Sequence, residues 1–255
     1  MLCRVSHVRG FSWRVLSITV GYEAEIVSAL YTDSFGEGSD YMPRFRAVLF
    51  DFDGTLADSY AAITASVNHV LSHYGHTNLA EAQVRTLVGH GLESLMQTIL
   101  PDRDPGEAAR LYREHHPSVM KSHTRLLAGV PEGLATLQSH GIRMGICSNK
   151  PSYFTRQLVQ MFDLLPYFDV VMGPDDAGVA KPDPAMIYQS LARLDVLMDQ
   201  AVYVGDMEVD IETGRNAGIE TWVVPTGSTD DATLHRAGYA RIFAGIPEIV
   251  REILN

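Results

Sequence analysis

Short apolar runs alternate with amphipathic helical patterns along most of this 255-residue chain. Continuous apolar runs of this kind are typical of strands that are buried on both faces. The runs cover residues 47–50, 142–147, 170–172, 201–204, 221–224 and, more weakly, 242–243. The helical patterns between and after them cover residues 131–140, 151–162, 184–194, 209–217 and 247–254. This alternation predicts an α/β fold with a doubly wound parallel sheet that helices cover on both faces.

One long interval interrupts the alternation. Residues 58–126 show no strand pattern, and their apolar residues recur at helical spacing over 63–74 and again over 87–99. A Gly-His-Gly sequence at 89–91 breaks the second pattern, and a third helix is expected over 107–123. Such an insertion is too long for a simple crossover. We therefore expect an α/β core made of residues 44–57 and 127–255, with residues 58–126 inserted as an α-helical cap.

The first 43 residues do not share this pattern. Basic residues occur without acids over 1–22, and acids occur without bases over 23–42. The uncharged run over 15–22 is short for the apolar region of a signal peptide, and no clean cleavage site follows it. We interpret residues 1–43 as a poorly ordered N-terminal extension, with Met42 as an alternative start.

Charge and cysteine content narrow the classes of function. The chain has 20 basic and 31 acidic residues, a formal net charge of -11, which disfavours binding to nucleic acid or to a membrane surface. Cys3 and Cys147 form no metal-binding or disulfide pattern, so a reducing, cytoplasmic location is expected. Only three of the 20 basic residues are lysines. A lysine at a special position is therefore informative, because its compact ammonium differs from the arginine fork.

Polar residues follow the predicted strands at their carboxyl ends, where open parallel sheets bind ligands. These residues are Asp51, Asp53, Gly54, Thr55, Ser148, Asn149, Lys150, Asp175, Asp176, Lys181, Gly205, Asp206 and Asp210. Each of them singly could be an ordinary turn or helix-capping residue. Together they place four carboxylates at the ends of two strands, with Lys181 as the visible positive charge. Carboxylates this close repel one another, and a bound divalent cation is the simplest way to neutralise their charge.

Four ordered motifs carry a resemblance to a known family. Asp51-Phe-Asp53-Gly54-Thr55-Leu56, Ser148, the isolated Lys181 and Gly205-Asp206-x-x-x-Asp210 resemble the motifs of the haloacid dehalogenase (HAD) superfamily over roughly residues 45–252. The segments Cys147-Ser148-Asn149-Lys150-Pro151, Lys181-Pro182-Asp183-Pro184 and Val88-Gly89-His90-Gly91 are similar to those of its phosphoglycolate phosphatases. The resemblance implies a HAD-like core with a cap. It also implies an Mg²⁺-dependent phosphatase that acts on a small phosphomonoester such as 2-phosphoglycolate.

The resemblance implies a role for each acid of the first motif. Asp51 is expected to attack phosphorus as a nucleophile and to form an aspartyl-phosphate, which divides the hydrolysis into two easier steps. Asp53 is expected to protonate the leaving alkoxide and then to deprotonate the attacking water. The Mg²⁺ ion is expected on Asp51, on the backbone carbonyl of Asp53 and on Asp206.

Other residues are expected to bind the phosphoryl group or to support the site. Ser148, Asn149 and Lys181 are the expected phosphate-binding residues. Thr55 and Asp210 are expected to be supporting residues, and Asp210 is expected to position Lys181 or a metal-bound water.

Some candidates have an ordinary structural interpretation beside the functional one. His90, between two glycines where a cap loop meets the core, is a candidate substrate contact at even odds. The histidines at 69, 73 and 76 have helical spacing, but exposed cap surface explains them better than a metal site. Asp175 and Asp176 are as well explained by a solvated loop as by a metal site.

Several alternatives stay open at this point. A pyrophosphatase or a sugar-phosphate mutase uses the same fold, whereas a dehalogenase has no alkoxide to protonate and so gives Asp53 no role. A phosphorylatable receiver module uses a similar set of residues, but its acceptor aspartate follows a later strand and it lacks a cap. A dinucleotide-binding module is disfavoured because no GxGxxG follows the first strand. The expected partner is a small phosphorylated metabolite, and the sequence does not set the oligomeric state.

Overall fold

A computed structural model describes residues 44–229, 231–238 and 241–255. The predicted N-terminal extension, residues 1–43, lies outside the described residues. Those that are described belong to one unit, Pro43–Asn255. Within the described ranges, no helix is both long enough and apolar enough to span a membrane.

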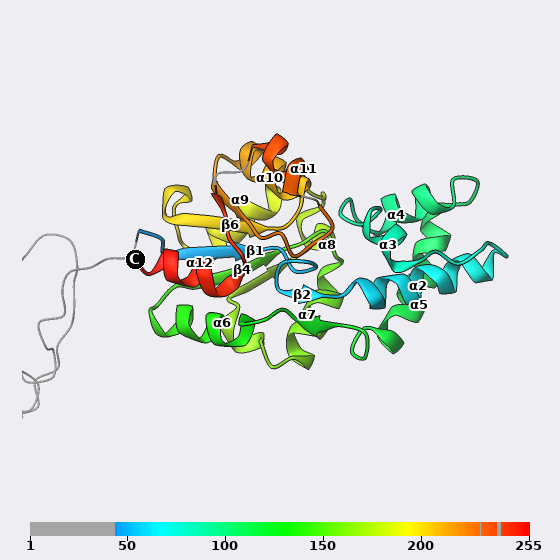
Figure 1. The fold of residues 1–255 in the computed structure, drawn as a ribbon, viewed down its shortest axis with the longest axis horizontal. Helices are drawn as coiled ribbons and strands as arrows, with labels where there is room; N and C mark the ends of the chain where they lie inside the picture. Colours follow the sequence, from blue (N-terminus) through cyan, green and yellow to red (C-terminus); the bar gives the residue numbers. More distant parts are fainter. Residues whose placement is uncertain (1–43, 230, 239–240) are drawn as a thin grey trace, which may run out of the picture. The chain divides into compact units, whose positions relative to one another are not determined.

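A six-stranded parallel sheet forms the centre of the core (Figure 1). Its strand order is β5-β4-β1-β6-β7-β8, which runs outward in both directions from β1 and confirms the predicted doubly wound α/β fold. The strands are β1 (Ala47–Phe50), β4 (Arg143–Cys147), β5 (Val170–Met172), β6 (Ala201–Gly205), β7 (Glu220–Val223) and β8 (Arg241–Ile242). Each lies within one or two residues of its predicted position. The strands are apolar at consecutive positions because helices cover both faces of the sheet.

Alternate residues of β1 contribute to different hydrophobic cores. Val48 and Phe50 belong to the larger core cluster, whereas Ala47 and Leu49 belong to the second. The larger cluster includes residues of α6 (Val130–Ser139), α7 (Ser152–Met161) and α12 (Ile246–Ile253). The second includes residues of α9 (Ala185–Leu194) and α10 (Glu208–Ala217). Shorter elements complete the core: η1 (Leu165–Tyr167), α8 (Pro174–Ala177), η2 (Met198–Gln200) and α11 (Asp231–Ala237).

Four helices occupy the interval after β1. They are α2 (Tyr60–His73), α3 (Glu81–Arg85), α4 (Leu92–Ile99) and α5 (Pro105–Val119). Figure 1 shows them as a group beyond the end of the sheet, on the side where β1 leads into β2. The structure differs from the predicted pattern in two details. The short helix α3 was not predicted, and α5 ends at Val119 rather than at residue 123.

Two short strands join this helical group to the core, where the sequence predicted none. β2 (Ala57–Asp58) pairs antiparallel with β3 (Arg125–Leu126). Asp58 also forms ion pairs with Arg85, at 2.9 Å, and with Arg125, at 3.3 Å. The chain therefore leaves the core and returns to it at a single paired point. A two-residue strand is too short to show a period-two pattern, which is why sequence periodicity missed it.

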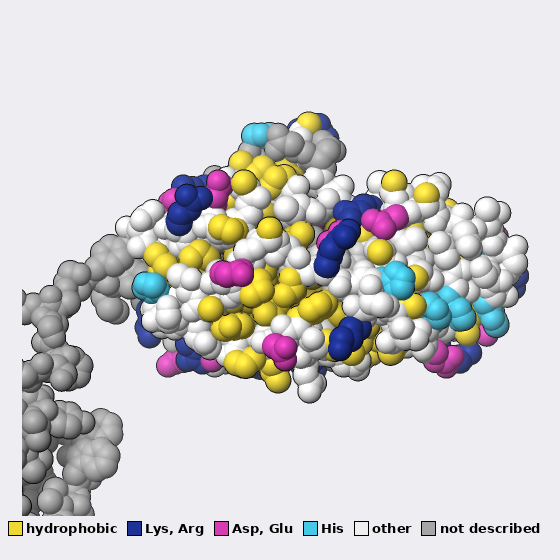
Figure 2. All heavy atoms as spheres, turned by 60° about the horizontal axis from the view of Figure 1, so that its bottom comes forward, with side chains coloured by type: hydrophobic (Ala, Val, Ile, Leu, Met, Phe, Trp, Pro, Cys, Tyr) yellow, Lys and Arg dark blue, Asp and Glu magenta, His cyan; other side chains and the backbone are white. Residues whose placement is uncertain are grey.

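The histidines of the cap lie on its surface, with one exception. His69, His73 and His76 are exposed, and the His69 ring stacks on that of His115 at 4.1 Å between centroids. Figure 2 shows histidine side chains gathered over this part of the molecule. His116 is instead fully buried, and burial lowers its pKa to about 2, so that it packs as a neutral ring. These contacts are those of helix packing.

Candidate active site

The carboxyl ends of three adjacent strands bring the predicted site residues together. Asp51 follows β1, Ser148 follows β4 and Asp206 follows β6, and β4, β1 and β6 are neighbours in the sheet. Lys181 reaches the same place from the loop between α8 and α9. All four side chains are buried, at 5% exposure or less. The parallel order of the strands therefore collects residues that are up to 155 positions apart, from Asp51 to Asp206.

Lys181 lies at the centre of this group. Its Nζ is 3.1 Å from Asp51 Oδ1, 2.6 Å from Asp210 Oδ1 and 3.0 Å from the Tyr203 hydroxyl. Burial by itself disfavours the ammonium, but the attraction of the two carboxylates is stronger and raises the pKa of Lys181 above its usual value. The side chain is therefore a fixed positive charge beside Asp51.

Asp210 holds Lys181 and the start of α10 in place. Its Oδ1 accepts hydrogen bonds from Lys181 and, at 2.8 Å, from the Tyr203 hydroxyl. Its Oδ2 accepts the backbone N–H groups of Asp206, at 3.1 Å, and Met207, at 3.0 Å. Both oxygens are thus used within the protein. In this arrangement Asp210 is a positioning residue.

Asp206 offers an oxygen that has no partner. Its Oδ1 accepts a hydrogen bond from Thr55 Oγ1 at 2.8 Å, whereas its Oδ2 is buried without a hydrogen bond among the described residues. Asp51, Asp206 and Asp210 can each place one oxygen within 4.8 Å of the others. Two glycines pack against this carboxylate, since a Cβ on Gly54 or Gly227 would lie 2.4 or 1.5 Å from Asp206 Oδ2.

The pKa values of these acids reflect their crowding. Burial raises the pKa of Asp51 to about 6, although Lys181 opposes the shift. Burial, together with the charges of Asp210 and Asp51, raises the pKa of Asp206 well above its usual range. Buried acids with an unpartnered oxygen are the donor set that a hard divalent cation prefers. The residues present therefore fit a cation between Asp51 and Asp206.

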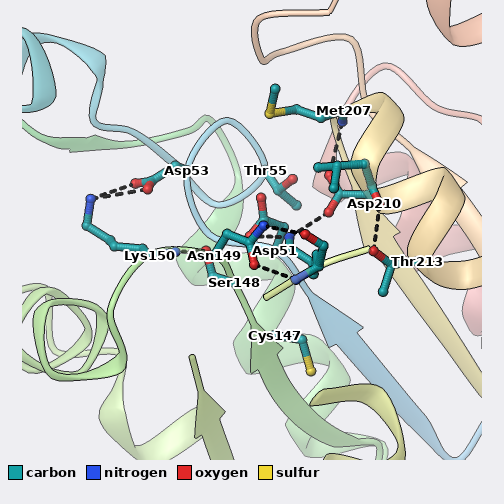
Figure 3. Close-up of polar contacts among 12 residues, drawn as sticks. Asp51, Asp53, Thr55, Cys147, Ser148, Asn149, Lys150, Met207, Asp210 and Thr213 are labelled. Carbon is teal, nitrogen blue, oxygen red and sulfur yellow. Dashed lines mark hydrogen bonds and ion pairs between the residues drawn. The ribbon is translucent and has the colours of Figure 1, made fainter. Parts of the chain in front are cut away.

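Asp53 forms a separate ion pair on the other side of Asp51. Its carboxylate lies 3.1 and 3.2 Å from Lys150 Nζ, and the Ser59 hydroxyl also donates to it. Figure 3 shows the Asp53–Lys150 pair and Asp210 on opposite sides of Asp51. The Lys150 side chain is only 4% exposed. The site thus contains a second buried ammonium, paired with the second acid.

These residues form the polar wall of a cavity of about 60 Å³. The polar lining residues are Asp51, Asp53, Ser148, Asn149, Lys150 and Lys181. The cap contributes Ile63, Val88, Gly89, Gly91, Leu92, Leu95 and Tyr112 to the opposite wall. The cavity therefore has charged groups at the sheet end and apolar side chains under the cap, with space for a few water molecules.

Comparison with known proteins identifies the family. The model of the haloacid dehalogenase-like hydrolases matches residues 48–224. The chain belongs to this family. A phosphoglycolate phosphatase of Cereibacter sphaeroides is 32% identical over 219 residues, which cover 81% of this chain and 98% of that protein. A phosphoglycolate phosphatase of Aquifex aeolicus is 29% identical over 203 residues, which cover 80% and 90%.

Solved structures agree with this assignment. A haloacid dehalogenase-like hydrolase from Bacteroides fragilis is 27% identical with a TM-score of 0.76, covering 80% of this chain and 99% of that one. A predicted phosphoglycolate phosphatase from Haemophilus somnus shares the fold at a TM-score of 0.78 and 22% identity, covering 83% and 99%. The predictions of the HAD family and of a phosphoric monoester hydrolase are thus confirmed. This chain is a phosphatase of the HAD type.

Within this HAD phosphatase, Asn149 lines the cavity while its side-chain amide is bound to the backbone of Gly89 and Lys181. Its binding of a phosphoryl oxygen, which was expected through a backbone N–H, stays a prediction. His90 is exposed and lines a neighbouring groove of about 430 Å³ rather than the cavity over Asp51. Here the cap lines the cavity with the glycines on either side of His90.

Sequence reasoning missed the place of Lys150 in the site. Lys181 was predicted to be the visible positive charge among the acids, and this was wrong because Lys150 is also buried there and pairs with Asp53. The signal that could have found it was the rarity of lysine. Only Lys121, Lys150 and Lys181 occur, and the last two are the buried lysines of the site.

Three other residues near the strand ends lie outside the cavity lining: Cys147 contacts Ser190, Asp175 binds Ser152 and Asp176 pairs with Arg156.

Proposed function

We propose that this HAD phosphatase hydrolyses small phosphomonoesters with Mg²⁺, by way of an aspartyl-phosphate on Asp51. The observation that carries the proposal is the polar wall of the cavity. There the buried Asp51 carboxylate lies 3.1 Å from the Lys181 ammonium, and an unpartnered oxygen of Asp206 is close by. A phosphoryl group needs such a combination of a nucleophile, a fixed positive charge and oxygen ligands for a cation.

The chain's own residues supply both proposed steps. In the first, which starts with Asp53 in its protonated form, an oxygen of Asp51 bonds to phosphorus, the ester P–O bond breaks and the leaving alkoxide takes the proton of Asp53. In the second, water attacks the phosphorus, Asp53 takes its proton, and phosphate leaves the regenerated Asp51. Ser148 and Lys181, which line the cavity together with Asp51, would hold the phosphoryl oxygens. Lys150 and Ser59 hold the Asp53 carboxylate at the cavity wall.

Magnesium is the proposed cofactor. Its expected ligands are side-chain oxygens of Asp51 and Asp206 and the backbone carbonyl of Asp53. When bound, the ion would supply charge neutralisation between the carboxylates and the substrate phosphate. The unpartnered Asp206 oxygen and the raised pKa values of both acids support this assignment.

The proposed substrate is a small phosphorylated metabolite. The cavity is small and is lined on one side by the cap, and 2-phosphoglycolate is the first candidate because the Cereibacter and Aquifex relatives are named for it. The net charge of -11 supports such a partner over nucleic acid or a membrane. On the face shown in Figure 2, basic side chains are interspersed with acidic ones. A cytoplasmic location is part of the proposal, supported by the free thiol of Cys147.

The lining of the cavity favours a phosphatase over a mutase or a pyrophosphatase. Either alternative must hold a second phosphate, which requires positive charge beyond Lys181 and beyond Lys150, whose ammonium is paired with Asp53. The cap arginines Arg85 and Arg113 instead pair with Asp58 and Glu93, and neither arginine lines the cavity. A second phosphate would therefore face apolar cap side chains.

The test is a substrate screen with purified protein. The panel contains small phosphomonoesters including 2-phosphoglycolate, together with hexose phosphates and pyrophosphate, each with and without Mg²⁺. We expect Mg²⁺-dependent release of phosphate from a small monoester. Release from pyrophosphate alone, or turnover that persists when EDTA removes divalent metal, would contradict the proposal.

A further inference from the structure

One buried amide joins the cap to the loop that carries Lys181. Asn149 Nδ2 donates to the carbonyl of Gly89 at 2.8 Å and to the carbonyl of Lys181 at 3.1 Å. Asn149 Oδ1 accepts the backbone N–H of Lys181 at 2.7 Å. Both N–H donors of the amide and one acceptor site are thus used. A residue of the loop after β4 therefore contacts two other segments at once.

The contact with Gly89 lies where the cap closes the cavity. Gly89 and Gly91 have φ values of +128° and +91°, and both line the cavity. A Cβ on Gly89 would lie 2.6 Å from Cε of Met207, so the cap loop also packs closely on the loop after β6. Because Gly89 packs this closely, the position of its carbonyl reports whether the cap is closed.

The second contact of the Asn149 amide fixes the main chain of Lys181, whose ammonium pairs with Asp51. The ammonium of Lys181 is fixed by Asp51 and Asp210, and its main chain is fixed by the Asn149 amide. In the structure Asn149 is 6% exposed, with the cap loop in place. If the cap loop lifts, one N–H of its side chain exchanges the Gly89 carbonyl for water. The hydrogen bond gained on closing therefore means that a closed cap and an ordered amide stabilise each other.

We propose that Asn149 is a positioning residue that couples closure of the cap to the placement of Lys181. The coupling is reciprocal, as linkage requires: what loosens the cap loop also loosens the Lys181 loop. Its kinetic consequence rests on the proposed phosphatase function, whereas the structural coupling does not. Asn149 thereby makes the placement of Lys181 depend on a closed cap.

The kinetic test compares two asparagines whose side-chain amides each bond both the backbone N–H and the backbone carbonyl of one other residue. Asn68 in α2 bonds Leu79 through both Nδ2, at 2.9 Å, and Oδ1, at 2.8 Å, and it does not line the cavity. We expect Asn149→Ala to lower kcat about 10²-fold with KM changed less than about threefold, because Lys181 is misplaced in the transition state. Asn68→Ala should lower the melting temperature by about as much as Asn149→Ala does, and it should leave kcat at the wild-type value. Equal kcat values for the two variants would overturn the proposal.

The structural test perturbs the cap end alone and measures the lysine end. Gly89→Ala leaves Asn149 intact but strains the cap loop, because Gly89 has a φ of +128° that residues with a Cβ rarely adopt. We expect about tenfold faster hydrogen exchange at the Lys181 amide in Gly89→Ala than in the wild type, and unchanged exchange in β1. An unchanged Lys181 amide would overturn the coupling. This measurement needs no activity, so it decides the proposal even if no phosphomonoester is hydrolysed or if Asn149→Ala fails to fold.

Discussion

At the residue scale, the chemistry of the site follows from a few buried charges that control one another. Lys181 remains charged because Asp210 and Asp51 together outweigh the cost of its burial. Asp51 and Asp206 are instead less acidic than usual because burial penalises their charged forms. Binding of a cation between them would therefore displace protons at mildly acidic pH. The same burial that penalises the charged forms of these acids would favour binding of the proposed cation between them.

Asp51→Asn tests the nucleophile and its burial together. The pKa of Asp51 in the folded protein, about 6, is above its ordinary value of 3.8. Asp51 therefore destabilises the metal-free protein increasingly as pH rises from about 4 to about 6. We expect the substitution to abolish hydrolysis and to raise the metal-free unfolding free energy at pH 7, on the order of 2 kcal/mol. Thermal unfolding in EDTA should show the difference vanish near pH 4.

A variant that retains turnover would remove Asp51 as the nucleophile. A stability difference that stays constant between pH 4 and pH 7 would contradict its raised pKa.

Lys150→Met tests the ion pair that the sequence analysis missed. Removing the ammonium leaves the nearly buried Asp53 carboxylate without its cation, and breaking a buried pair costs about 3 kcal/mol. We expect a lower melting temperature and a lower kcat, since Lys150 orients Asp53. The matched control is Lys121→Met, which replaces an exposed lysine of the same chain. Similar melting temperatures for the two variants would show that the pair contributes nothing to stability.

At the element scale, the loop after β7 closes the proposed cation site from the side. The Thr226 hydroxyl donates to the Gly54 carbonyl at 2.6 Å, which ties this loop to the turn of the first motif. Gly227 next to it packs against the Asp206 carboxylate. The loop therefore restricts where Asp206 can point, although nothing in its own sequence resembles a ligand motif.

Gly227→Ala tests this contact. The added Cβ would lie 1.5 Å from Asp206 Oδ2, so either the loop or the carboxylate must move. We expect Mg²⁺ affinity, measured by calorimetry on the purified protein, to fall about tenfold or more, as in cases where supporting residues of a metal site are changed. Unchanged affinity would mean that the loop yields without disturbing Asp206.

At the scale of the whole molecule, the proposed cation would link Asp51 after β1 to Asp206 after β6 and should therefore stabilise the fold. Any ligand that binds only the folded state adds about 2.7 kcal/mol at 100 times its Kd. We expect Mg²⁺ to raise the melting temperature at pH 7 and to raise it less at pH 5. At the lower pH, protons compete for Asp51, whose pKa is about 6.

Asp206→Asn provides the control for this shift. It keeps the shape of the side chain and an oxygen that can accept from Thr55, but it removes one charge from the site. The Mg²⁺-dependent shift should largely disappear in this variant. A shift of the same size would place the ion elsewhere.

The sequence by itself determined the strands, the helical insertion and the acids at the sheet edge. It could do so because each strand is a local apolar run and because the carboxyl ends of parallel strands meet at one edge. Asp51, Ser148, Lys181 and Asp206 were predicted on this basis, and the structure brings them together.

The tertiary structure alone decided which polar groups touch. Lys150 pairs with Asp53 across 97 residues, and Asn149 reaches Gly89 across 60. The helix α3 and the β2–β3 pair are too short for a periodic pattern, so tertiary contacts stabilise them rather than local propensity. Periodicity reports which face of an element is buried. The partner of a buried charge or amide depends instead on angles and distances between elements, which are fixed only when the elements pack together in the folded chain.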